Sequence, residues 1–275
     1  MLRKPAVAGR FYPGNKEELQ RAVDGFLEPA ARTKAIGVIV PHAGYMYSGH
    51  VAGAVYSRIE LPQRTIVLCP NHTGFGMPLA IMRAGAWQTP LGELQIDEEL
   101  CTALINADPD LEDDIEAHRL EHSLEVQLPF MQHMAGSAVR FVPITIGVGD
   151  LAHLQALGRA IARVIQSIAP DTLIIASSDM NHYESDAITR VKDRKAIDQI
   201  LAMNPEGLHQ VVGRERISMC GYGPAVAMLT AAKILGASKA ELVKYATSGD
   251  VSSDFDHVVG YAGIVISSAA SGSAF

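Results

Sequence analysis

Apolar residues along this chain follow two patterns: short continuous runs, and longer segments in which they recur every three or four positions. Continuous runs bounded by turn residues are typical of strands buried on both faces of a sheet. We therefore predict strands at residues 35–40, 65–69, 139–146 and 172–176, followed by 241–246 and 258–266. The periodic segments predict helices at residues 51–59, 98–105, 124–134, 151–168, 186–203 and 224–235.

This alternation of strands and helices is typical of an α/β fold. We expect a three-layer sandwich, with a central sheet that is mainly parallel or mixed and helices on both of its faces. No linker rich in Ser, Gly or Pro interrupts the chain, so residues 1–268 are expected to form a single domain. Residues 269–275 are mostly small and are expected to form a flexible tail.

The charge balance is acidic, with 23 Lys and Arg against 30 Asp and Glu, and the basic residues do not cluster. Nucleic acid is therefore not an expected partner. No apolar stretch is long enough to cross a bilayer, and the first residues do not read as a secretory signal, so membrane insertion and export are not expected. The three cysteines are too scattered for a disulfide framework, which fits a cytoplasmic location.

Three of the predicted strands are followed at once by a segment that contains a histidine. His42 lies in PHAGY, His72 in PNH and His182 in SDMNH. Functional loops of open α/β sheets gather at the carboxyl ends of the strands, so we expect these histidines to share a cleft. A single histidine is more often structural, but three in equivalent places favour a chemical site.

Cys220 stands just before a predicted helix that has Pro224 in its first turn. A thiol at a helix N-terminus is expected to ionise readily. The thiolate could bind a metal or attack an electrophile, and a small buried side chain is the remaining alternative. Cys69 and Cys101 fit that last alternative, because both lie within apolar patterns.

Residues 118–122, HRLEH, match the H-x-x-E-H pattern of a class of zinc metalloproteases. In that pattern His118 and His122 bind zinc from one face of a helix, and Glu121 acts as the base. A helix that begins near Ser123 would leave His118 outside it, which argues against the shared face. Glu121 and His122 then remain as groups that could line a pocket.

Asp179 and His182 form a second pairing, a carboxylate and an imidazole three residues apart in a loop after a strand. Such a pair suits a general acid or base and the group that orients it. The alternative is an Asx turn beside a solvated histidine.

Seven short motifs follow one another along the chain. They are PAVAGRFYP at 5–13, PHAGY at 41–45, PNH at 70–72, EHSLEVQLP at 121–129, SDMNH at 178–182, MCG at 219–221 and YATSGD at 245–250. The chain therefore resembles a Memo family protein, the B component of the AmmeMemoRadiSam system, over nearly its whole length. Memo proteins are similar in fold to the class III extradiol dioxygenases, so the resemblance implies an extradiol-dioxygenase-like fold.

The resemblance also implies a metal site. Matched by motif, its ligands are His42, His72 and Cys220, and the expected metal is iron as Fe(II), with copper or zinc as alternatives. His182 falls at the place of the acid/base histidine of the dioxygenases, accompanied by Asp179. Cys220 replaces a carboxylate ligand of those enzymes, and a thiolate makes the site softer and open to oxidation.

We therefore expect a metal-dependent oxygenase or oxidoreductase, of the non-haem iron type, that acts on a small molecule. His182 would move protons, oriented by Asp179, while Tyr45, Glu121 and His122 would line the substrate pocket. One alternative is a regulatory protein that binds a metal or a peptide without turnover, and another is an H-x-x-E-H zinc protease. The partners implied by the resemblance are a radical-SAM protein and another protein of the AmmeMemoRadiSam system.

Overall fold

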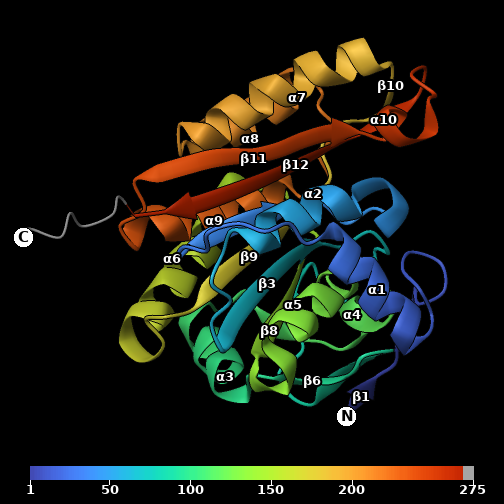
Figure 1. Ribbon diagram of the computed structural model, residues 1–275. Coiled ribbons are helices and arrows are strands. Elements are labelled where there is room, and N and C mark those ends of the chain that lie inside the picture. Colours follow the sequence, from blue (N-terminus) through green and yellow to red (C-terminus); the bar gives the residue numbers. More distant parts are fainter. Residues whose placement is uncertain (269–275) are drawn as a thin grey trace, which may run out of the picture.

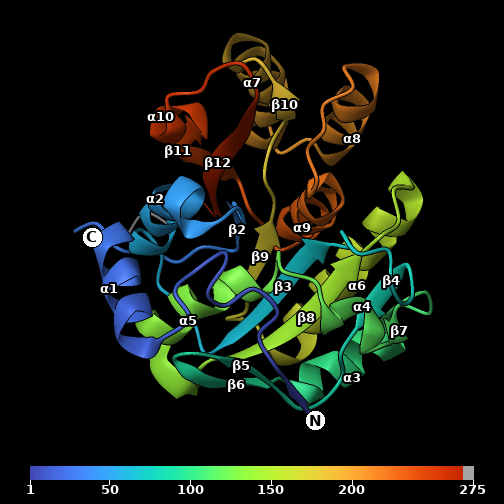
Figure 2. The same ribbon diagram turned by 90° about the vertical axis from the view of Figure 1, so that its right-hand side faces the viewer.

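Four buried strands form the centre of a mixed sheet. In the order β8 (Arg140–Ile146), β3 (Arg64–Pro70), β9 (Leu173–Ser177) and β2 (Gly37–Val40), they run parallel to one another. Every residue in them is buried except the first of β3 and of β8, as expected for strands covered on both faces. The computed structural model, drawn in Figures 1 and 2, describes residues 1–268. The predicted tail, 269–275, lies outside the described residues.

Within residues 1–268, strands on both sides extend this centre into a sheet of twelve strands. Beyond β2, the antiparallel β12 (Val258–Ser267) pairs with β11 (Lys239–Thr247) and with the short β10 (His182–Glu184). Beyond β8 lie β6 (Gly92–Ile96), β5 (Ala86–Thr89) and β1 (Leu2–Arg3), and a short branch adds β4 (Leu79–Ile81) and β7 (Glu112–Asp113).

Helices cover both faces of the sheet, as Figure 2 shows. On one side lie α1 (Lys16–Phe26), α2 (Tyr45–Ser57) and α5 (Leu128–Ala135), and on the other α3 (Glu98–Ala107), α6 (Leu151–Ile168) and α9 (Tyr222–Ile234). α7 (Asp186–Leu201) packs on β11 and β12, next to α8 (Pro205–Arg214). Shorter pieces are α4 (Glu116–Arg119), α10 (Gly249–Ser252) and the 3₁₀ turns η1 (Glu125–Gln127) and η2 (Gly136–Ala138). The predicted α/β fold is confirmed.

The predicted elements correspond to β2, β3, β8, β9, β11 and β12, and α6 matches its predicted bounds at both ends. α2 begins at Tyr45, six residues before its predicted start, because Gly44 ends the turn after β2 and caps the helix. The helix predicted at 124–134 is divided into η1 and α5. Among residues 1–268, no helix is both long and apolar enough to span a bilayer.

Candidate metal centre

The carboxyl ends of β2, β3 and β9 lie side by side, and the loops that follow them hold the candidate site. The register pairs Val40 of β2 with Ser177 of β9, and β3 lies on the other side of β9. Asp179 connects two of the loops, since its Oδ1 accepts hydrogen bonds from the backbone N–H of His42 at 2.7 Å and of Ala43 at 3.3 Å. His42 is therefore positioned both by the end of β2 and by the carboxylate of Asp179, which follows β9.

The imidazole of His42 is held in one tautomer. Its Nδ1 lies 3.0 Å from Oγ of Ser177. The Ser177 hydroxyl donates its only proton to the carbonyl oxygen of Ser123 at 2.6 Å, and it accepts a hydrogen bond from the amide of Gln127 at 2.9 Å. Because that proton is committed, Nδ1 of His42 must be the donor in its own contact, and Nε2 keeps its lone pair.

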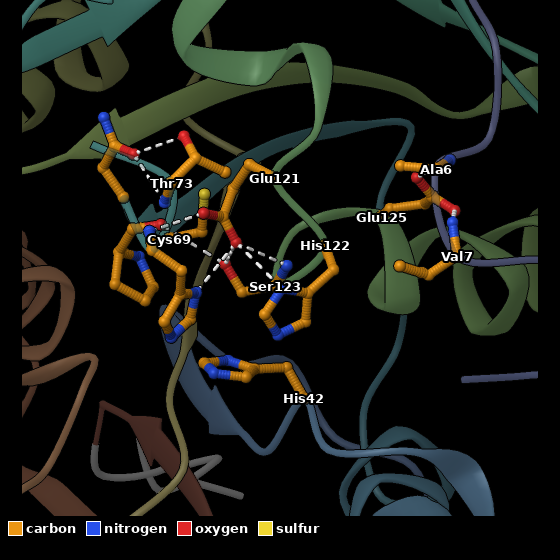
Figure 3. A network of polar contacts seen from close by, with 12 residues as sticks. Ala6, Val7, His42, Cys69, Thr73, Glu121, His122, Ser123 and Glu125 are labelled. Atoms are coloured by element: carbon orange, nitrogen blue, oxygen red, sulfur yellow. Dashed lines mark hydrogen bonds and ion pairs between the residues drawn. The ribbon is translucent and has the colours of Figure 1, made fainter. Parts of the chain in front are cut away.

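The buried carboxylate of Glu121, shown beside Ser123 and His122 in Figure 3, holds His72 at two points. One oxygen of Glu121 accepts the backbone N–H of His72 at 2.6 Å, and the other lies 2.9 Å from its Nδ1. Burial by itself raises the pKa of Glu121, but the contacts with His72 and the hydrogen bonds from Ser123 lower it well below its ordinary value. An ionised carboxylate only accepts, so Nδ1 of His72 carries the proton and Nε2 is free to bind a metal.

His122 completes a group of three imidazoles. Its ring stacks on His72 with the centroids 4.6 Å apart and stands edge-on to His42 at 5.6 Å. One possible ligand atom from each of the three histidines lies within 4.8 Å of the other two. Nδ1 of His122 is 3.5 Å from Glu121, so one carboxylate faces the inner nitrogen of two rings. His122, expected in the pocket lining, thus also belongs to the cluster that could hold a metal.

Burial keeps the imidazoles of His42 and His122 neutral. It lowers the pKa of His42 well below its ordinary value, an effect strengthened by His72 and His122. Burial also lowers the pKa of His122 to about 4, although the charge of Glu121 opposes this shift. Neutral imidazoles with converging lone pairs are ligands for zinc, copper and iron. The three-histidine cluster is therefore suited to hold a metal ion.

Cys220 contacts the cluster at His42. Its Sγ lies 3.2 Å from Nε2 of that ring and 3.7 Å from the carbonyl oxygen of Asp179. Burial, and then the charge of Asp179, raise the pKa of the Cys220 thiol well above its ordinary value. Burial therefore outweighs the helix N-terminus from which we expected a thiolate, and the thiol donates to Nε2 of His42. The role of Cys220 as a metal ligand stays a prediction.

His182 and Asp179, expected to act as a pair, have separate partners. Nδ1 of His182 lies 2.9 Å from the carbonyl oxygen of Ser218, and its backbone N–H donates to the Ser218 hydroxyl at 2.7 Å. A carbonyl only accepts, so Nε2 is the acceptor nitrogen of the His182 ring. Burial raises the pKa of Asp179 to about 6, against the hydrogen bond from His42 that lowers it. Ser218 thus orients His182, and proton transfer by either residue stays a prediction.

A cavity of about 840 Å³ opens in front of the cluster. Its walls include the five residues predicted as metal-binding or catalytic, which are His42, His72, Asp179, His182 and Cys220. They also include His122, the third member of the histidine cluster. Four aromatic residues in these walls, for which we predicted no role, are Phe11, Tyr47, Tyr183 and Tyr261. Phe11 lies within the motif PAVAGRFYP, so the motif could have indicated that this residue lies at the site. The volume suits a small-molecule ligand.

Two residues expected in this pocket lie behind its wall. Glu121 is fully buried beneath His72. Tyr45 is also buried, and its hydroxyl donates to the carbonyl oxygen of Val126 at 2.7 Å. It lines a neighbouring cavity instead. Both residues therefore support the site from behind its surface.

His118 is separate from the metal-binding cluster. α4 ends at Arg119, so His118 and His122 do not share a helix. His118 is fully buried, with its Nδ1 2.8 Å from the hydroxyl of Thr145 and its ring against Trp87. Within residues 1–268, the paired ligands that an H-x-x-E-H protease requires are not formed.

Known proteins match this chain over almost its whole length. The "MEMO1 family protein MK0963" of Methanopyrus kandleri is 44% identical, and the match covers 96% of this chain and 99% of that protein. MEMO1 family proteins of Pyrobaculum arsenaticum and Aquifex aeolicus are each 42% identical, with 96% of this chain and 98% of each relative covered.

A solved structure, described as "uncharacterized protein JW3007 from Escherichia coli K12", shares the fold with a TM-score of 0.57 at 13% identity. The match covers 83% of this chain and 98% of that one. The family model described as "Memo-like protein" matches residues 3–265. With that match and these relatives spanning almost its full length, the chain belongs to the Memo family.

Proposed function

We propose that this protein is a non-haem iron enzyme of the oxygenase or oxidoreductase type that acts on a small molecule in the cytoplasm. One observation carries the proposal. Three imidazoles, His42, His72 and His122, converge on the wall of a cavity of about 840 Å³. A cluster of possible metal ligands that opens into such a cavity is typical of a catalytic centre.

The donor set fits a redox-active metal. His42, His72 and His122 would hold the ion, and Cys220, in contact with His42, would join them as a thiolate. Imidazole and thiolate together suit iron and copper better than magnesium or calcium. Ferrous iron would supply the O₂ activation and one-electron chemistry that side chains lack.

The protein's own groups would orient the ligands and move protons. Glu121 holds His72 through Nδ1, which leaves Nε2 of that ring for the metal, and it also lies 3.5 Å from Nδ1 of His122. Nε2 of His182 is an acceptor in a residue that lines the cavity, so it can take up a proton from a bound molecule. Asp179, with a pKa raised to about 6, can hold or release a proton close to neutral pH.

We also propose that the protein acts within the AmmeMemoRadiSam system, together with a radical-SAM protein. The support is membership of the Memo family.

Oxygen uptake tests the proposed activity. Protein purified without O₂ is loaded with Fe(II), and O₂ consumption is measured against a panel of small molecules. We expect consumption that requires both iron and a substrate, that persists in His118→Ala and that is lost in His42→Ala. Tight iron binding without O₂ consumption for any member of the panel would contradict the proposal and favour a regulatory metal-binding protein.

A further inference from the structure

A second cavity, of about 600 Å³, lies beside the one in front of the metal centre. The loop from Gly9 to Pro13 forms one wall, and α1 with the first turn of α2 forms the other. The lining is mainly apolar, and its side chains include Phe11, Pro13, Ala22, Phe26, Met46 and Tyr47. Arg10 is the one charged residue among the described residues of this lining. We call this space the apolar cavity.

The apolar cavity adjoins the metal centre. The two cavities share Phe11, Gly44 and Tyr47 as lining residues. The ring of Phe11 lies against His122, with the ring centroids 4.7 Å apart. The two cavities therefore adjoin at a single aromatic ring, that of Phe11, which also contacts the three-histidine cluster.

The walls of the apolar cavity are firmly anchored. The Tyr12 hydroxyl donates to Glu125 at 2.6 Å, and Arg3 forms a buried ion pair with the same carboxylate, also at 2.6 Å. Tyr45, at the start of α2, donates its backbone N–H to the carbonyl oxygen of Phe11 at 2.7 Å. The loop is thus already tied to the core and to α2, so a ligand need not spend binding energy on ordering it.

The two cavities differ in chemistry. Imidazoles, hydroxyls and the carboxylates of Asp179 and Asp254 line the cavity at the metal centre. In the apolar cavity Met46 is 67% exposed, and Phe11, Pro13 and Phe26 are half-buried. Removing apolar surface of this kind from water is favourable. Together the two spaces suit a molecule that is polar at one end and apolar at the other.

We propose that the apolar cavity binds the hydrocarbon tail of the substrate, while the polar head of that substrate binds at the metal centre. The substrate class is therefore an amphipathic molecule with a metal-binding head and an alkyl or similarly apolar chain. The proposal rests on the proposed function, because the head requires the metal ion.

A series of alkyl hydroxamates, from acetohydroxamate to octanohydroxamate, tests the proposal. The hydroxamate head chelates a metal through two oxygens, and the tail lengthens by one methylene at each step. Each compound is titrated by calorimetry into protein loaded with zinc, which is redox-inert. We expect little change in affinity among the shortest members, whose tails stay in the cavity at the metal centre. Affinity then rises by up to about fourfold for each further methylene, since burial of one CH₂ contributes about 0.8 kcal/mol.

Two variants locate the tail. Met46→Asp places a charge in the apolar cavity, at an exposed position that does not line the cavity at the metal centre. We therefore expect it to remove the rise in affinity with chain length and to leave acetohydroxamate binding unchanged. Ala22→Phe partly fills the cavity from α1, so the rise ends at a shorter chain. Val191→Asp, at a 59% exposed apolar position of α7 outside both linings, is the matched control and keeps the wild-type dependence.

The outcomes separate this proposal from the function on which it rests. Affinity that does not change with chain length, or a rise that persists unaltered in Met46→Asp, overturns the tail site while the metal centre stands. If acetohydroxamate itself does not bind to the zinc-loaded protein, the metal centre fails, and the tail site fails with it.

Discussion

Glu121 is the residue on which the geometry of the metal centre depends most. Its carboxylate holds both the backbone and Nδ1 of His72, and it faces Nδ1 of His122. It is fully buried and does not appear among the residues that line the cavity. A carboxylate in this place fixes the tautomer of His72 and makes that imidazole a better donor to a metal.

Replacing this carboxylate with an amide should weaken metal binding. In Glu121→Gln we expect the affinity for Zn(II) or Fe(II) to fall about 10- to 100-fold, the usual effect of losing a carboxylate that orients a histidine ligand. Competition with a chromophoric chelator measures the affinity. Glu93→Gln, at an exposed position of β6, is the control. Equal affinities in the two variants would show that Glu121 does not orient the ligands.

Cobalt substitution tests whether Cys220 joins the metal. A cobalt–thiolate bond gives a strong charge-transfer absorption in the near ultraviolet, which imidazole ligands do not produce. We expect this band in the Co(II)-loaded protein and its loss in Cys220→Ser, with the weaker visible bands of bound cobalt retained. A wild-type spectrum without the band would mean that Cys220 lies beside the ion without binding it.

The sequence indicated His42 and His72 because each directly follows a buried apolar run, a place that parallel strands bring to one edge of the sheet. It did not assign His122 to the same cluster. That position depends on the path of the chain between α4 and η1, where no repeating pattern operates. For the same reason the sequence placed Glu121 in the pocket, whereas the loop turns its carboxylate beneath His72.

At the scale of elements, α7 supports the loop that carries His182. Asp193 of α7 is buried, accepts the backbone N–H of Asn181 at 2.8 Å and accepts the hydroxyl of Tyr245 at 2.7 Å. The side-chain oxygen of Asn181 in turn accepts hydrogen bonds from Ser218, which holds His182. The packing of a helix on the sheet therefore reaches a residue of the cavity wall.

Asp193 should also make stability depend on pH. Burial, opposed by the hydrogen bond from Tyr245, raises its pKa to about 7, whereas an unfolded chain releases this proton near its ordinary value of about 3.9. Between these values the folded state binds more protons, so the contribution of Asp193 is complete below about pH 4 and is lost as the pH rises through 7. The shift corresponds to a contribution on the order of 4 kcal/mol.

Urea denaturation at pH 5 and pH 8 measures this effect in wild type and in Asp193→Asn. The amide cannot ionise, and the Tyr245 hydroxyl can turn to accept from it, so the variant should fold. We expect the wild type to lose more free energy of unfolding between the two pH values than the variant does. The same loss in both proteins would exclude Asp193 as its source.

The sequence predicted central elements better than peripheral ones. The fully buried strands carry continuous apolar runs, and the long amphipathic α6 carries a strong helical period. α1 was not predicted, although Leu19, Ala22, Val23 and Phe26 recur at helical spacing and Leu19 and Val23 are buried. The division of the helix predicted at 124–134 has a local cause, because Pro129 fits only the first turn of a helix and α5 therefore begins at Leu128.

At the scale of the whole molecule, the fold gathers residues from distant parts of the chain at one edge of the sheet. The alternation of strands and helices was enough to predict that edge. The two cavities could not be predicted, because the loop from Gly9 to Pro13 forms part of both and its place is set by single contacts such as that of Tyr12 with Glu125. On the proposed function, the segments that would select the substrate are therefore mainly those without a regular pattern.

Metal analysis of protein purified without oxygen and offered Fe(II) tests the central claim most directly. The wild type is compared by mass spectrometry of its metal content with single alanine variants of His42, His72, His122 and His118. We expect close to one ion per chain in the wild type and in His118→Ala, and a large loss in each of the other three. A wild type that takes up no metal, or full occupancy in all three variants of the cluster, would contradict the account.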